Sequence, residues 1–153
     1  MSPLARSATI GFATGIRSVS PATVVCWAAS TDRLAVPPSL EPLRRASIAR
    51  NVGLVALAEV VIDKLPWVPR RTLLPLLLWR MAVGAFLGSV ISMSEGDDRI
   101  PGAIAGMAGA VAGAYGGLAV RTALVERLDV PDLPAGIAGD ILAPTLSLQA
   151  VRR

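Results

Sequence analysis

Six ionisable residues lie inside, or close to the ends of, long apolar stretches of this sequence. They are Arg17, Glu59, Asp63, Arg80, Arg121 and Asp140. An ionisable group in the apolar core of a membrane costs at least about 2.5 kcal/mol to insert, so it usually faces other helices or a watery cavity and finds a partner. The six residues are therefore candidates either for ion pairs between helices or for a polar pathway.

The spacing of these residues predicts which of them pair. Glu59 and Asp63 are four residues apart, so they share one face of a helix. Two carboxylates that close repel, and a cation must neutralise them or one of them must take up a proton. Arg17 and Arg80 are the expected cations, and we predict that Glu59 lies deep in its segment within salt-bridge reach of Arg17. Arg121 and Asp140, on successive segments, are expected to form a second pair.

Other kinds of site are excluded by the residues that the chain lacks. The sequence contains no histidine and one cysteine, Cys26. These numbers exclude histidine acid–base catalysis, nearly all zinc sites and a disulfide within the chain. No nucleophile–base pair is visible either. We therefore expect no enzyme, no resident metal and no cofactor.

The composition indicates that the segments carrying these charges lie in a membrane. Of the 153 residues, 53% are hydrophobic and 17% are charged, whereas an ordinary soluble domain carries about 25% charged residues. So few charges do not cover a soluble surface, and we expect the lipid bilayer to be a main partner. The net charge of +4 comes from dispersed arginines rather than from a basic face beside aromatic residues, so we expect no binding to nucleic acid.

Five apolar segments follow one another along the chain. They predict an all-α, polytopic membrane protein with about five transmembrane or re-entrant helices. We expect these helices to form a single domain over 1–153. Their approximate bounds are 7–29, 48–65, 72–94, 101–124 and 133–151. A bilayer core of about 30 Å requires about 20 helical residues. Segments 72–94 and 101–124 meet this length, whereas the other three are shorter or interrupted and could be broken, tilted or re-entrant. Five spans would divide the basic residues almost equally between the two sides, so the sequence predicts no orientation.

Glycines recur at every fourth position in three of these segments. The residues concerned are Gly11 and Gly15, Gly84 and Gly88, and Gly109, Gly113 and Gly117. Helices in lipid associate largely through close backbone approach over small residues. We therefore predict tight helix packing and self-association, although the pattern does not separate packing within one chain from packing between copies in a homo-oligomer.

A weak internal repeat joins these glycines to the charged residues. In each half, a helix with spaced glycines and an arginine (Arg17 or Arg121) precedes a helix with a carboxylate (Glu59 or Asp140). In a five-span chain the two units would have opposite orientations. Inverted repeats of this kind surround the central site of many transporters.

Several motifs follow one another in a fixed order along the chain: Thr14–Ser18 with Pro21, Glu59 with 63–66, Pro69 to Arg80, Gly84-Ala85 with Gly88, and 131–134 before Asp140. In this combination and order they resemble a family of bacterial membrane proteins called domain of unknown function 4126. The last helix of the family typically carries a Glu-Asp pair, where this chain has Gly139-Asp140. The resemblance covers nearly the whole chain and implies a multi-pass helical protein of the bacterial inner membrane, without an established activity.

Two functions remain open from the sequence. The first is a small transporter or channel-like protein in which Arg17, Glu59, Asp63 and Asp140 line the path of a small ion or solute. The second is a structural or assembly protein whose buried charges only hold its helices together, because buried ion pairs often serve architecture alone.

Overall fold

The computed structural model describes residues 1–62, 74–128 and 132–152, and every regular element in these ranges is a helix. This confirms the predicted all-α class. In chain order the elements are α1 (Pro3–Ile16), α2 (Ser20–Ser30), the 3₁₀ helix η1 (Pro38–Arg44), α3 (Ala46–Ile62), α4 (Leu74–Ser94), α5 (Arg99–Leu128) and α6 (Asp132–Val151).

The first predicted segment, 7–29, is not one helix but two. α1 ends at Ile16 because Arg17 has extended backbone angles, and α2 begins at Ser20 with Pro21 in its first turn. In a continuous helix, the ring of Pro21 would clash with the carbonyl of residue 17, and one backbone hydrogen bond would be lost. The same proline is well tolerated near the start of α2, where the N–H groups have no partner within the helix.

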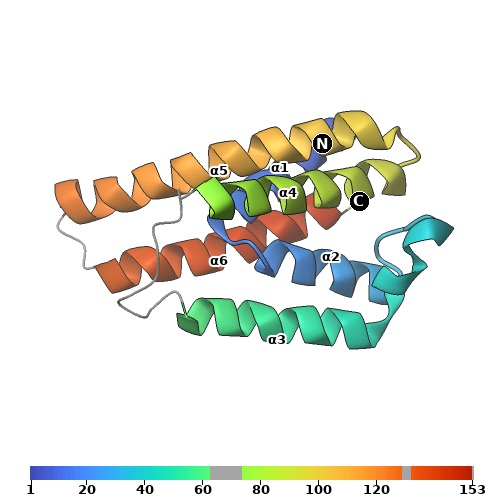
Figure 1. Ribbon diagram of the computed structural model, residues 1–153, viewed down its shortest axis with the longest axis horizontal. Coiled ribbons are helices and arrows are strands. Elements are labelled where there is room, and N and C mark those ends of the chain that lie inside the picture. The colour runs from blue at the N-terminus through green and yellow to red at the C-terminus, as the bar shows by residue number, and fades with distance from the viewer. Residues whose placement is uncertain (63–73, 129–131, 153) are drawn as a thin grey trace.

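α1 and α2 run in opposite directions and form a helical hairpin (Figure 1). α2 returns towards the end of the bundle at which α1 began, where the C-terminus and the turn between α4 and α5 also lie. Side-chain contacts hold this end together, because Arg6 of α1 binds both Glu95 in the turn and the carbonyl of Ala150 in α6. We call it the terminal end of the bundle. The two termini thus share one end, whereas five spans would have separated them.

The buried core lies towards the terminal end and joins α1, α2, α4 and α6. It is built from side chains that no solvent reaches or nearly so: Ile10, Val25, Ala28, Leu34, Leu87, Val90, Ile91, Ala150 and Val151. Two helices of this core, α1 and α4, also pack against α5. At several of their contacts with α5, the backbones of the two helices approach each other directly.

Glycines make this close approach between backbones. A β-carbon added at Gly11 or Gly84 would overlap the carbonyl oxygen of Gly106, which therefore lies between α1 and α4. Added β-carbons at Gly15, Gly88, Gly109 and Gly113 would likewise overlap backbone atoms of the neighbouring helix. At Gly117 the nearest atom is a side-chain carbon of Ile16 at 3.4 Å, an ordinary contact. All these contacts lie within one chain, so the glycines need no second copy to explain them.

Among the residues that the structure describes, two helices, α4 and the 99–124 part of α5, are long and apolar enough to cross a membrane. The prediction of five spans is therefore not confirmed as a whole. Much of the apolar surface of these helices is not used for packing in the chain: Leu74 is 67% exposed and Val120 is 59% exposed. The core helix of a soluble protein would bury such residues, so this exposure favours a lipid environment.

Candidate functional site

The charged residues predicted from the sequence converge on the break between α1 and α2, which we define as residues 17–19. Arg17 closes α1, and its backbone N–H donates to the carbonyl of Ala13 at 2.9 Å. Beyond it, the chain takes two residues to enter α2. The end of α1 and the start of α2 thus lie together inside the bundle, and each leaves backbone groups without partners in its own helix.

Glu59 of α3 binds the start of α2. One oxygen of its carboxylate accepts from the N–H of Ser18 and the other from the N–H of Val19, both at 3.0 Å. The N-terminus of a helix carries a partial positive charge, so a carboxylate is favourable at this position. Hydrogen bonds from amides to an ionised carboxylate are also stronger than neutral ones. Glu59 therefore acts as a cap supplied by another helix.

Arg80 of α4 binds the other side of the break. Its Nη1 donates to the carbonyl oxygen of Gly15 at 2.6 Å, and the residue is only 5% exposed. The C-terminus of a helix carries a partial negative charge and unpaired carbonyl groups, both of which favour a cation. The two ends of the broken helix thus receive side chains of complementary charge from two different helices.

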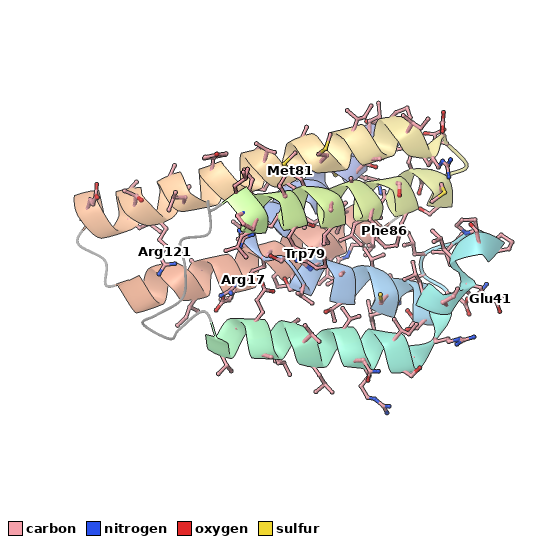
Figure 2. All side chains as sticks on the ribbon, viewed as in Figure 1. Arg17, Glu41, Trp79, Met81, Phe86 and Arg121 are labelled. Atoms are coloured by element: carbon pink, nitrogen blue, oxygen red, sulfur yellow. The ribbon has the colours of Figure 1, made fainter. Side chains whose placement is uncertain are left out.

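Arg17 itself forms an ion pair with Asp140 of α6. The side chains are 3% and 15% exposed, so the pair is largely shielded from solvent. Figure 2 shows Arg17 between the break and α6. Through this pair, α6 joins α3 and α4 as the third helix that places a charge at the break.

These contacts correct the predicted pairing of Arg17 with Glu59. Arg17 and Glu59 do meet at the same place, but Arg17 is paired with Asp140 while Glu59 is bound by backbone N–H groups. Arg80, expected to neutralise carboxylates, binds the backbone carbonyl of Gly15; its pairing with Asp63, which lies outside the described residues, stays a prediction. The backbone groups at the end of α1 and the start of α2 bind Arg80 and Glu59, and such backbone partners are not visible in the pattern of charged residues.

The contacts described above do not involve two of the predicted residues, Asp63 and Arg121. Asp63 falls outside the described residues. Arg121 is half-buried and extends from α5 towards α6 (Figure 2), the helix that carries Asp140; the pairing of Arg121 with Asp140 stays a prediction. In the described part of the chain, no group of three or more metal-binding side chains gathers in one place.

One buried charge was missed by the sequence reasoning. Arg6 is 5% exposed, but it lies just before the bounds 7–29 predicted for the first segment. The signal was present: Ser2 caps α1 by accepting from the N–H of Ala5 at 3.2 Å, and Pro3 is the first residue of the helix. A serine followed by proline marks a helix start, which places Arg6 one turn inside α1.

The fold and the site define a class: an all-α protein in which a broken helix is held by charges from three other helices and in which two long apolar helices are suited to a membrane. The chain belongs to the family described as a domain of unknown function (DUF4126), whose match covers residues 4–151. This confirms the resemblance drawn from the motifs. No curated protein and no solved structure matches the chain.

Proposed function

We propose that this protein crosses the bacterial inner membrane several times, with α3 to α6 as spans and the α1–α2 hairpin entering from the terminal end. α3 and α6 contain 17 and 20 residues, and at 1.5 Å per residue they extend about 25 and about 30 Å. These lengths approach the thickness of a bilayer core. α1 and α2, with 14 and 11 residues, extend only about 21 and about 17 Å, so they suit a re-entrant hairpin.

We further propose that the protein moves a small ion or polar solute, and that the α1–α2 break is the site through which it passes. The observation that carries this proposal is a pair of helix ends inside the bundle, bound by Glu59, Arg80 and the Arg17–Asp140 pair. Many transporters place discontinuous helices at their central site, where half-helix ends bind ions and charged groups of the substrate. Irregular backbone at membrane depth is otherwise rare, because its polar groups need partners.

The contacts at the break are of a kind that a solute can replace. A cation can take the place of Arg17 at the carboxylate of Asp140, and an anionic group can take the place of Glu59 at the N–H groups of Ser18 and Val19. Each exchange keeps the group that the solute binds satisfied, while the displaced side chain of Arg17 or Glu59 has to find another partner or reach water.

Flux measurements with the purified full-length protein in liposomes test this function. Vesicles report the movement of protons, sodium, potassium and chloride with ion-sensitive dyes, and we expect faster movement of at least one ion than in protein-free vesicles. Asp140→Asn and Glu59→Gln should reduce that flux at least tenfold. Asp32→Asn is the matched control, because Asp32 is 74% exposed in an ion pair with Arg44 away from the break. Equal rates with and without protein for all four ions would contradict an ion pathway.

The alternative is a structural or assembly protein. It is favoured by the finding that Arg17, Glu59, Arg80 and Asp140 all have partners within the chain. The two functions differ in one measurable respect. Variants that keep the stability of the protein but lose the flux indicate transport, whereas variants that lose stability in a protein without measurable flux indicate architecture.

A further inference from the structure

A cavity of about 560 Å³ lies at the terminal end of the bundle, away from the α1–α2 break. It is bounded by the start of α1, the end of α4 and the end of α6, and its lining residues are Met1, Arg6, Ser94, Glu95, Gln149 and Arg152. Pockets that hold small molecules usually measure about 300–1,000 Å³ and combine a few well-placed polar groups. Five of these six lining residues are polar or charged, in contrast to the apolar outer faces of the helices.

Arg6 is the buried member of this lining. Its Nε donates to the carbonyl oxygen of Ala150 at 2.7 Å, and its Nη1 pairs with the carboxylate of Glu95. Its third nitrogen, Nη2, is buried and has no hydrogen-bond partner. Buried donors are nearly always satisfied, and an orphaned one calls for an explanation such as a ligand. On a guanidinium group, the missing partner is an acceptor, most favourably an anion.

The charged side chains that line the cavity also favour an anion, because positive charges outnumber negative ones. Glu95 neutralises Arg6, and the exposed Arg152 leaves the lining with an excess of one positive charge. Gln149 adds an exposed amide beside it. Two arginines with an amide donor suit a phosphate group: Nη2 of Arg6 supplies one donor, and the planar guanidinium of Arg152 is able to bind two phosphate oxygens at once.

We propose that this cavity binds the phosphate group of an organic anion. Its volume exceeds the needs of a bare phosphate, so the ligand carries an organic part. Ser94, in the lining, is the last residue of α4, so in the membrane arrangement proposed above the cavity lies at the depth of phospholipid headgroups. A phospholipid headgroup and a soluble phosphate ester share the same recognition chemistry. If the ligand is a phospholipid, the proposal depends on the membrane arrangement proposed above; if it is a soluble phosphate ester, it does not.

Binding to the full-length protein in a neutral detergent tests the ligand class. The probes are dihexanoylphosphatidylglycerol, glycerol 3-phosphate and inorganic phosphate, with dihexanoylglycerol as the probe that lacks phosphate. We expect the organic phosphates to bind and dihexanoylglycerol not to bind. Tighter binding of the phospholipid identifies a headgroup site, and equal binding of glycerol 3-phosphate identifies a site for soluble esters. Absence of binding by both at millimolar concentration, or equal binding of dihexanoylglycerol, would overturn the proposal.

An arginine variant tests the location of the site. Arg152→Gln should weaken binding of the organic phosphate about tenfold, because it removes one charge-assisted contact. Arg99→Gln is the matched control: Arg99 is exposed at the start of α5, at the same end of the molecule, and does not line the cavity. Arg152 is itself exposed, so its replacement should leave folding intact, whereas replacing Arg6 would also release Ala150 and Glu95. Equal weakening by Arg152→Gln and Arg99→Gln would show unspecific attraction to a basic surface and would refute the site.

Discussion

Arg17 and Asp140 are 123 residues apart in the chain and form a largely buried ion pair. The pair ties the point where α1 ends to the middle of α6. Because Arg17 also belongs to the backbone of the break, the same residue both interrupts the first segment and anchors it to the last helix. The geometry of the break therefore depends on α6 as much as on its own sequence.

Removing one member of this pair should destabilise the protein more than removing both. Arg17→Gln or Asp140→Asn alone leaves a buried charge without its main partner, at an expected loss of about 3–5 kcal/mol in the free energy of unfolding. The double variant should recover part of this loss. Denaturant unfolding in detergent measures all three variants. A double-variant loss equal to the sum of the single losses would show that the two side chains are not coupled.

Glu59→Gln should loosen the start of α2 without unfolding the bundle. The variant keeps one acceptor oxygen but loses the negative charge at the helix N-terminus, an expected loss of about 1–2 kcal/mol. Hydrogen exchange of the N–H groups of Ser18 and Val19 should become faster. Glu41→Gln in η1 serves as the control, since Glu41 is exposed. Unchanged exchange at both amides would speak against the capping role.

The glycines of α5 should differ sharply in their tolerance of a single methyl group. At Gly113 an added β-carbon would overlap the carbonyl of Phe12, whereas at Gly117 it would meet only a side-chain carbon of Ile16 at 3.4 Å. Gly113→Ala should therefore lower the melting temperature, and Gly113→Leu should prevent folding. Gly117→Ala should be neutral or stabilising, because alanine favours a helix over glycine by about 1 kcal/mol. Equal melting temperatures for the two alanine variants would contradict the packing.

Both termini should lie on one side of the membrane. The terminal end carries the exposed residues Arg33, Arg44, Arg45, Arg99 and Arg152, and the positive-inside rule then places it in the cytoplasm. Reporter proteins that are active only in the cytoplasm, fused separately to each terminus, should both be active. Activity of only one of the two fusions would show that the termini lie on opposite sides of the membrane. It would then indicate an odd number of spans and exclude a hairpin that enters and leaves on the same side.

Some features of the site could be predicted because they depend on nearby residues. The first segment was among those that could be broken, and its break falls at Arg17, shortly before Pro21. The four-residue spacing of glycines marked the faces that pack closely. The correct partners could not be predicted in the same way. The N–H groups of Ser18 and Val19 donate to Glu59 because α3 ends beside the break. Spacing along the chain does not show which helices become neighbours.

By itself, the sequence determined the helical class, the approximate positions of the apolar segments and the family, and it identified Arg17 and Arg80, but not Arg6, as buried charges. Each of these follows from local patterns: apolar length, helix-breaking residues and ordered motifs. The tertiary structure alone decided that α1 and α2 form a hairpin, that both termini share one end, and that Arg17 pairs with Asp140 instead of Glu59. The physical reason is that helices apolar on nearly every side show no single face for packing. Their arrangement is set by close backbone contact at glycines and by the need of each buried charge for a partner on another helix.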